Sequence, residues 1–516
     1  MRTKKSIINS SVNIITYMGI LVPNLVVRRV FLNTLGEELL GVNSLFNNII
    51  GLLSIVELGV GNAIVFSLYK PFAENDRVKV KGYLDFYLKL YRIIGNVVLV
   101  LGICLIPFLK YFMNGQVMGI DIIICYLLYL TNTYITYRFS YKSCILNVAQ
   151  EEFKISIGTA ISKILMVILQ ILLLYIIPSF NIYLIVQLIT TLLYFLVLNI
   201  YIDKQYEWLK SIRGEISQNE KKELSTNIKA LFIHKIGSFV VESTDNLLIS
   251  YFINLSTVAK FGSYNVIISA CKNIINKGIS GITASIGNLL VSDKNNTAYL
   301  VHKRIFFISF WVTSFICISL YNTLDQFIIL WIGESQLLNH FTLVILIINL
   351  YFTCMRGSVE RFQEGSGNFV KDRYAPIFES IINLTSSIIL VKYIGLPGIF
   401  IGTLISNIMV IFWTKPLIVY KYIFNRSVLD YYKMYFKHLF ISIIPLLITN
   451  FLTRNINIGI VSISSFLINC IINIIVINIV YIVIFIKNEE FKYFKNIITK
   501  IIKIKKTNDN LDQNAS

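Results

Sequence analysis

The sequence predicts an all-α polytopic membrane protein with about fourteen transmembrane helices. Apolar stretches of about twenty residues, long enough to cross a bilayer, recur from residue 9 to residue 486. The composition agrees, with 55% hydrophobic residues, 15% charged residues and a mean hydropathy of +0.69, whereas a soluble domain has about 25% charged residues. Lysine and arginine collect in alternate gaps between the apolar stretches. Together these patterns exclude a soluble enzyme.

Each predicted span is an apolar run that ends at charged residues or at a turn signal. Pro178 separates the fifth span from the sixth, and Gly395 with Pro397 separates the eleventh from the twelfth, because proline and glycine interrupt helices. The polar segment 203–229 separates the sixth span from the seventh. In chain order, the predicted spans are 9–30, 42–68, 88–109, 120–137, 155–177, 182–202, 231–253, 264–291, 305–324, 338–354, 375–391, 398–418, 439–452 and 458–486.

The distribution of basic residues predicts the orientation of the chain. With Met1 placed inside, the inner segments hold 35 lysines and arginines, and the outer segments hold only Lys110, Lys260, Lys392 and Arg454. Cytoplasmic loops carry such an excess of positive charge. We therefore predict that both termini are cytoplasmic and that the protein lies in the plasma (inner) membrane. The net charge of +19 follows from this topology and gives no support for nucleic-acid binding.

A weak internal repeat with a period near 220 residues predicts two related bundles of six helices. The segment 41–44 matches 262–265, Arg138 matches Arg356, and the turn that ends at Pro178 matches the turn that ends at Pro397. An even number of spans separates the copies, so they keep one orientation, as in parallel-repeat transporters, and enclose a central cavity. The predicted parts are an N-terminal bundle (1–202), a cytoplasmic linker (203–229), a C-terminal bundle (230–426), two additional transmembrane helices (427–486) and a basic and polar cytoplasmic tail (487–516).

Polar residues inside the first span mark one side of the candidate site. Ionisable groups are costly within a bilayer and usually face a water-filled cavity or a partner. Asn13, Tyr17, Asn24 and Arg28 are spaced so that they lie on one helix face. Arg28 and its neighbour Arg29 are therefore candidate cavity residues for binding an anion. Extension of the side chain to the outer interface is the alternative for both arginines. It is an equal alternative for Arg29, whereas the position of Arg28 in the polar stripe favours cavity lining.

The seventh and eighth spans carry the remaining candidates. Lys235, Glu242 and Asp245 lie in the seventh span, and Lys272 and Lys277 lie in a polar stripe of the eighth. The two lysines of the stripe favour an anion site, and Lys235 is a further candidate for it. The alternatives are that Lys235 reaches the cytoplasmic interface and that the polar stripe joins helices. Glu242 and Asp245 lie too deep for such short side chains to reach water and are candidate cavity acids. The alternative is a pair of protonated acids that hydrogen-bond to neighbouring helices.

The sequence contains no motif that indicates catalysis or a bound cofactor. It has no G-x-x-x-x-G-K-[ST] loop for nucleotide phosphates and no nucleophile elbow. The seven cysteines are scattered, without the paired spacing of a metal site or a disulfide framework. We therefore expect no enzymatic activity, no catalytic residues, no metal and no cofactor.

Several short motifs follow one another in a recognisable order over spans one to twelve. They are Leu35-Gly36 with Gly41, Glu57-Leu58-Gly59 with Gly61-Asn62-Ala63, Asp245 with Phe261-Gly262-Ser263-Tyr264, and Gly395-Leu396-Pro397-Gly398-Ile399 with Gly402-Thr403-Leu404-Ile405-Ser406. In these motifs the chain resembles the polysaccharide-transport flippases, of the O-antigen and capsule-unit type, in the multidrug/oligosaccharidyl-lipid/polysaccharide (MOP) exporter superfamily.

The resemblance implies a flippase that moves polyprenyl-pyrophosphate-linked oligosaccharide units by alternating access, with basic cavity residues facing the pyrophosphate. Its implied partners are the lipid-linked oligosaccharide and membrane lipids, with a polysaccharide polymerase and glycosyltransferases as further candidates. Two other functions stay open. A drug or cation antiporter of the same superfamily would use Glu242 and Asp245 as a cation site. A membrane-embedded polymerase or ligase is disfavoured because no outer loop is large enough for a catalytic domain.

Overall fold

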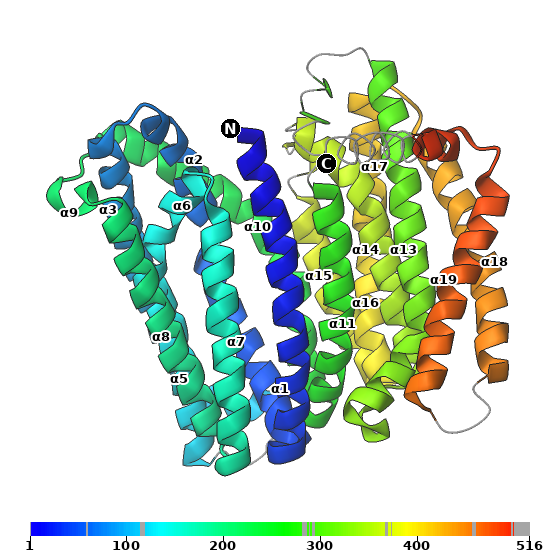
Figure 1. The fold of residues 1–516 in the computed structure, drawn as a ribbon, viewed down its shortest axis with the longest axis horizontal. Coiled ribbons are helices and arrows are strands. Elements are labelled where there is room, and N and C mark those ends of the chain that lie inside the picture. Colours follow the sequence, from blue (N-terminus) through cyan, green and yellow to red (C-terminus); the bar gives the residue numbers. More distant parts are fainter. Residues whose placement is uncertain are drawn as a thin grey trace, which may run out of the picture. The chain divides into compact units, whose positions relative to one another are not determined.

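The structure, a computed structural model, describes residues 2–57, 60–113, 119–280, 286–287, 289–290, 295–366, 370–372, 374–456, 461–496 and 499. Over these ranges the secondary structure is α-helical with short 3₁₀ and π segments, and they contain no strand (Figure 1). The predicted all-α fold is confirmed.

Eleven helical segments in the described ranges are long and apolar enough to cross a membrane. They include the predicted first span, the third to sixth and the ninth to fourteenth, so the polytopic membrane class is confirmed. The predicted seventh span and the eighth as far as Ser280 also form helices, α10 (Gln218–Phe252) and α11 (Leu255–Ser280), and most of the rest of the eighth span lies outside the described residues. Their polar and charged residues lower their mean hydropathy, so these two helices are not among the eleven apolar segments. The eleven segments are Ile15–Leu53, Arg77–Phe112, Ile120–Val148, Glu152–Ile176, Phe180–Gln205, Thr297–Ile332, His340–Ser366, Ala375–Ile394, Leu396–Ile423, Val428–Asn455 and Ile463–Phe485.

The structure corrects the boundary between the first and second predicted spans. One helix, α1 (Arg2–Leu53), covers the first span, the expected outer loop and the start of the second span. It changes direction at Gly36, whose φ of 86° is open to glycine because glycine has no Cβ. The second span is then completed by η1 (Ser54–Glu57) and α2 (Val60–Ala73). A single residue thus replaces the expected loop.

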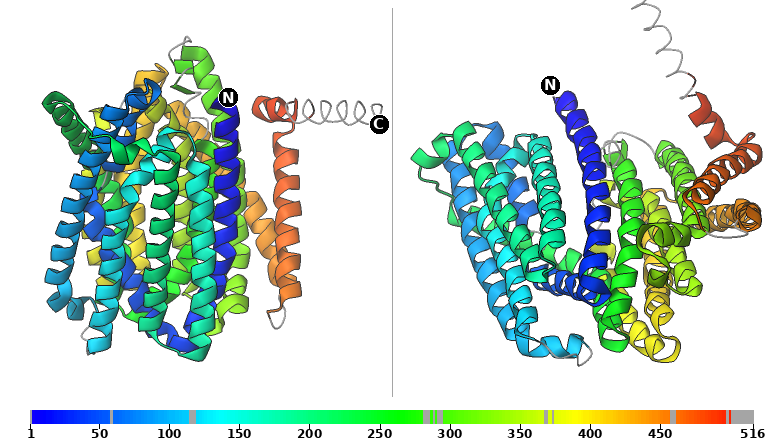
Figure 2. Two further views of the ribbon diagram at one scale, coloured as in Figure 1. Left: turned by 60° about the vertical axis from the view of Figure 1, so that its left-hand side comes forward. Right: turned by 60° about the horizontal axis from the view of Figure 1, so that its bottom comes forward.

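The chain forms two compact units, and the first contains residues 1–263 and 376–403. Within it, α5 (Ile120–Phe139) packs against α3 (Arg77–Leu105) and α8 (Phe180–Gln205). Helix α7 (Glu152–Ile176) packs against α1 and α8. These helices run side by side in all views (Figures 1 and 2). Aromatic rings fill the space between them, as where Phe46 of α1 meets Tyr126 of α5 with 5.2 Å between the ring centroids.

Most of the predicted linker 203–229 is helical. Helix α8 continues to Gln205, a short helix α9 (Trp208–Ser211) follows, and α10 begins at Gln218. The Ser217 hydroxyl accepts the amide hydrogen of Glu220 at 3.2 Å, and the Glu220 carboxylate accepts that of Ser217 at 2.8 Å. These reciprocal bonds satisfy two amides at the start of α10. They hold the pKa of Glu220 below its ordinary value, helped by Lys79.

The second unit contains residues 264–375 and 404–516. At its centre α13 (Asn295–Ile332) packs against α14 (His340–Ser366), α18 (Val428–Ile456) and α19 (Ile463–Phe485). Figures 1 and 2 show α18 and α19 side by side. The two additional helices predicted from the sequence are therefore part of a compact unit with α13.

A ladder of polar side chains joins α13 to α19. Tyr481 donates to the Ser314 hydroxyl at 2.8 Å, and Trp311 donates to the Asn478 side chain at 2.9 Å. Asn322 donates to the Asn473 side chain at 2.7 Å. Such bonds stabilise helix pairs where water is absent.

The predicted division into bundles at 1–202 and 230–426 follows the sequence repeat, whereas the compact units follow contacts, so that division stays a prediction. Beyond α19, residues 489–496 are helical, and most of the predicted tail after residue 496 lies outside the described residues. The remaining elements are η2 (Ile106–Phe108), α4 (Leu109–Phe112), η3 (Ser140–Ser143), α6 (Cys144–Val148), η4 (Glu334–Gln336), η5 (Val370–Asp372), α15 (Ala375–Ile394), α16 (Leu396–Ser406), η6 (Asn407–Ile411), α17 (Phe412–Ile418) and η7 (Val419–Ile423).

Candidate substrate site

Arg28 lies on α1, before the change of direction at Gly36, and its half-buried side chain reaches the first turns of α11. Its Nε donates to the Ser263 hydroxyl at 2.9 Å, and its Nη2 donates to the carbonyl of Ala259 at 2.9 Å. The Ser263 hydroxyl donates in turn to the same carbonyl at 3.1 Å. One turn of α11 therefore fixes the guanidinium of Arg28.

Two glycines allow α1 and α11 to approach this closely. A Cβ at Gly262 would lie 2.8 Å from Nη2 of Arg28, and a Cβ at Gly41 would lie 2.1 Å from the carbonyl oxygen of Leu255. Both distances are shorter than non-bonded atoms tolerate. At Gly41 the neighbour is backbone, so a larger residue would push the helices apart, whereas at Gly262 a larger residue would displace the guanidinium of Arg28. These glycines belong to the motifs that carry the family resemblance, and the structure gives those motifs a physical role at the α1–α11 crossing.

The charge of Arg28 is held by neutral groups. Both acceptors among its described hydrogen bonds, Ser263 and Ala259, are uncharged, and the nearby Tyr183 is a phenol. A guanidinium has five N–H donors, and the described bonds use Nε and Nη2. Donors and charge therefore remain for an anion, and guanidinium binds phosphate oxygens through two parallel bonds.

The N-terminal half of the predicted polar stripe on α1 contacts α7. Asn13 accepts a bond from the Ser156 hydroxyl and donates to Glu152 at 3.4 Å. Asn9 accepts the amide hydrogen of Phe153 at 3.0 Å. These contacts join the two helices, which is the alternative role of a polar stripe. Arg29 is exposed, and its place in a substrate site stays a prediction.

The other candidates lie on α10 and α11. Asp245 is half-buried on α10. Lys235 and Glu242 belong to the same helix, but their side chains lie outside the described residues. Lys272 is half-buried on α11, within electrostatic range of Cys354, and Lys277 is exposed. The structure thus joins Arg28 to the start of α11, and the convergence of the other candidates on one site stays a prediction.

Sequence reasoning missed the two partners of Arg28. Ser263 stands within the quoted Phe261-Gly262-Ser263-Tyr264 motif, so the motif contained a usable signal. The carbonyl of Ala259 left no signal, because every residue carries a carbonyl and only the crossing of α1 and α11 selects this one.

Comparison with solved structures identifies proteins that share this fold. The lipid II flippase MurJ in an inward closed conformation matches with a TM-score of 0.73 at 14% identity, covering 92% of this chain and 99% of that chain. An inward-facing multidrug resistance MATE family transporter of the MOP superfamily matches with a TM-score of 0.57 at 16% identity, covering 78% and 95%. A MATE transporter from Vibrio cholerae matches with a TM-score of 0.52 at 13% identity, covering 79% and 95%. No family model and no curated protein matches the sequence.

At these identities the likeness shows the fold. It confirms the predicted resemblance to the MOP superfamily at that level, while the O-antigen and capsule-unit type stays a prediction. The proteins that share the fold are a flippase and transporters.

Proposed function

We propose that this protein is a flippase that moves polyprenyl-pyrophosphate-linked oligosaccharide units across the plasma membrane by alternating access. Its product would serve cell-surface polysaccharide synthesis, together with glycosyltransferases and a polymerase. The fold shared with a lipid II flippase supports a lipid-linked substrate. The family motifs favour an oligosaccharide of the capsule or O-antigen kind.

The observation that carries the proposal is the environment of Arg28. A guanidinium held by neutral groups within an apolar helix is costly unless an anion binds there. The pyrophosphate of a polyprenyl carrier is such an anion, and each charge-assisted hydrogen bond to it contributes about 1.5–3 kcal/mol. Lys272 is the second residue that we assign to the head group, because it is half-buried in the polar stripe of α11.

A drug or cation antiporter is the second candidate function. The fold shared with MATE transporters supports it, and Asp245 with Glu242 would then form the cation site. The two functions differ in the charge of the substrate. Export of cationic dyes that depends on Asp245 but not on Arg28 would favour the antiporter.

The proposed function is tested by transport of a polyprenyl-pyrophosphate oligosaccharide into the lumen of reconstituted vesicles. We expect Arg28→Gln to lower the rate about 10-fold to 100-fold, because it removes a charge-assisted contact. Glutamine can still donate to Ser263 or Ala259, so the helix crossing is retained. We expect Lys272→Gln to lower the rate in the same direction.

Lys110→Gln is the matched control, because it removes one charge from an exposed residue of the predicted outer face. This control should transport at the wild-type rate. Wild-type rates in Arg28→Gln, in Lys272→Gln and in the double variant would refute the assignment. A deletion strain should accumulate single lipid-linked units on the inside, and a normal distribution of units in that strain would refute the flippase itself.

A further inference from the structure

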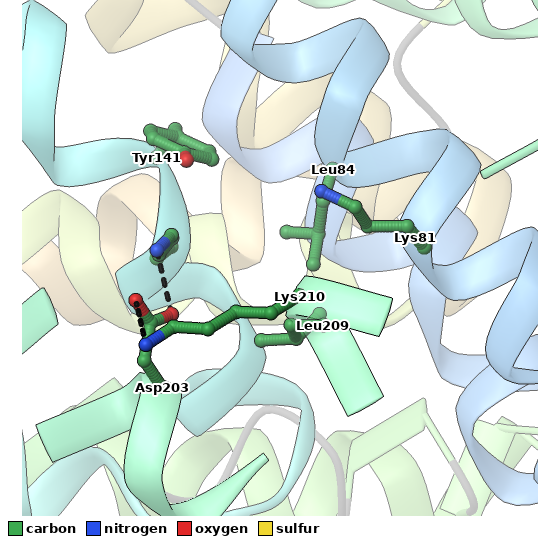
Figure 3. Close-up of a pocket in the computed structure, with 7 residues that line it drawn as sticks. Lys81, Leu84, Tyr141, Asp203, Leu209 and Lys210 are labelled. Carbon is green, nitrogen blue, oxygen red and sulfur yellow. Dashed lines mark hydrogen bonds and ion pairs between the residues drawn. The ribbon is translucent and has the colours of Figure 1, made fainter. Parts of the chain in front are cut away.

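The first unit contains a pocket of about 290 Å³ (Figure 3). It lies at those helix ends that we predict to face the cytoplasm. Lys81 comes from α3, Lys142 from η3, Asp203 from the end of α8 and Lys210 from α9. Segments far apart in the sequence thus bring three lysines and one carboxylate to a single cavity. None of these residues belongs to the candidate substrate site.

The pocket has an excess of positive charge. Asp203 pairs with Lys142 at 2.6 Å and with Lys210 at 3.8 Å, as the dashed lines in Figure 3 show. Lys81 pairs at 2.8 Å with Asp85, which lies one turn further along the same helix. Arg92 and Arg138 lie within electrostatic range of Tyr141, which lines the pocket. The lining itself therefore has three lysines and one carboxylate, and the neighbouring residues add two arginines and one carboxylate.

The arrangement suits an anion that competes with Asp203. The side chains of Lys142 and Asp203 are 20% and 16% exposed, so the pair is partly shielded from water, whereas the Lys210 side chain is 69% exposed. Phosphate offers more acceptor oxygens than a carboxylate and forms strong charge-assisted bonds with lysine. The volume is at the lower end of small-molecule pockets, which are about 300–1,000 Å³. It therefore admits one phosphate group with a short polar attachment.

The apolar part of the pocket comes from α3 and from the linker helix α9. Leu84 of α3 and Leu209 of α9 are both buried, and they line the cavity beside the lysines. A phosphate ester has carbon atoms next to its phosphate, and this apolar wall would contact them. Inorganic phosphate would use the lysines alone.

The pocket lies where the linker docks on α3. A Cβ at Gly214 would lie 2.3 Å from the backbone nitrogen of Gly82, so two glycines permit direct backbone contact. The amide of Glu215 donates to the carbonyl of Val78 at 3.3 Å. Because Leu209 and Lys210 belong to this docked segment, an anion bound among the lysines would tie the linker to α3 and η3.

We propose that this pocket binds a phosphate group and thereby holds the linker on the first unit. The phosphate comes either from the head group of an anionic lipid in the adjoining leaflet or from a soluble phosphate compound. The site would act on the linker, not on the transported substrate.

The test follows acetylation of Lys210 by a water-soluble N-hydroxysuccinimide ester, read by mass spectrometry of the full-length protein. In detergent, inorganic phosphate at constant ionic strength should slow this reaction about fivefold, the upper range for an exposed charge pair. Lys222 of the same chain is exposed and outside the pocket, and its rate should not change. In nanodiscs without phosphate, phosphatidylglycerol should protect Lys210 relative to phosphatidylcholine if the ligand is a lipid head group. Protection by inorganic phosphate alone assigns a soluble ligand.

Substitutions in the pocket should change the protection of Lys210 by phosphate in opposite directions, depending on whether a lysine or the carboxylate is removed. Lys142→Ala should weaken the protection of Lys210 by phosphate. Lys81→Gln should weaken it as well, and this variant keeps the ion pair between Lys142 and Asp203. Asp203→Asn removes the competing carboxylate and should make phosphate protect at lower concentration. Lys204→Ala, which changes an exposed lysine outside the pocket, should leave protection unchanged. Absence of protection by both phosphate and phosphatidylglycerol, or weaker protection in Asp203→Asn, would overturn the proposal.

Discussion

Asp245 is half-buried on α10, seven residues before that helix ends at Phe252. At a rise of 1.5 Å per residue, this places its Cα about 10 Å inside the end of the helix. A short acidic side chain at such depth either carries charge against a partner or takes up a proton in one state of the cycle. The property to test is therefore the charge and proton uptake of the Asp245 carboxyl group, with its shape kept constant.

We predict that Asp245→Asn abolishes gradient-driven transport while lipid-oligosaccharide binding persists. Asparagine keeps the shape and the hydrogen bonding of aspartate but does not titrate. The measurement is the transport rate in reconstituted vesicles as a function of pH, with binding measured on the same preparation. Asp121→Asn, which changes an exposed acid at the start of α5, should transport normally. A wild-type rate with an unchanged pH profile in Asp245→Asn would make the residue structural.

At the scale of elements, the attachment of α19 to α13 depends on buried polar contacts. Asn473 is 1% exposed, accepts from Asn322 at 2.7 Å and donates to the carbonyl of Asn469 at 2.7 Å. Asn322 also donates to Thr449 of α18 at 2.9 Å. One asparagine on α13 therefore holds both C-terminal helices.

We predict that Asn473→Ala lowers the free energy of unfolding by about 0.6–1.7 kcal/mol, the range for a hydrogen bond between membrane helices. Amide hydrogen exchange in α19 should become faster, while exchange in α3 of the other unit should not. The measurement combines denaturant unfolding in mixed micelles with exchange mass spectrometry. Ile479→Ala, at a position 54% exposed on the same helix, is the control. Equal stability of Asn473→Ala and wild type would show that the ladder is dispensable.

At the scale of the whole molecule, the topology is the prediction with the widest consequences. Glu38, just after Gly36, and Ser217, just before α10, are both exposed, so both accept a probe. The basic residues predict that position 38 faces outward and position 217 faces the cytoplasm. We expect a membrane-impermeant thiol reagent to label Glu38→Cys in intact cells and to label Ser217→Cys only after lysis. The seven native cysteines, all free, are first replaced. Labelling of Ser217→Cys in intact cells would reverse the topology.

The sequence by itself determined the helical membrane class and the approximate position of most spans. It also singled out Arg28 as a candidate, and the role of that residue stays a prediction. Hydrophobic length and charge asymmetry are local or additive properties, and they survive without knowledge of any contact. The exceptions were also physical. Gly36 redirects α1 without a loop, and Ser217 with Glu220 starts α10 inside a segment that looked like a polar linker.

Only the tertiary structure decided what surrounds those residues. The carbonyl of Ala259 and the hydroxyl of Ser263 hold Arg28 because α1 and α11 cross at Gly41 and Gly262. Lysines from α3, η3 and α9 line one pocket together with Asp203. In the sequence, the charges of these lysines indicated only the topology of the chain. A hydropathy pattern records whether a side chain prefers water or lipid. It does not record which distant side chain lies beside it, because that depends on how the helices pack.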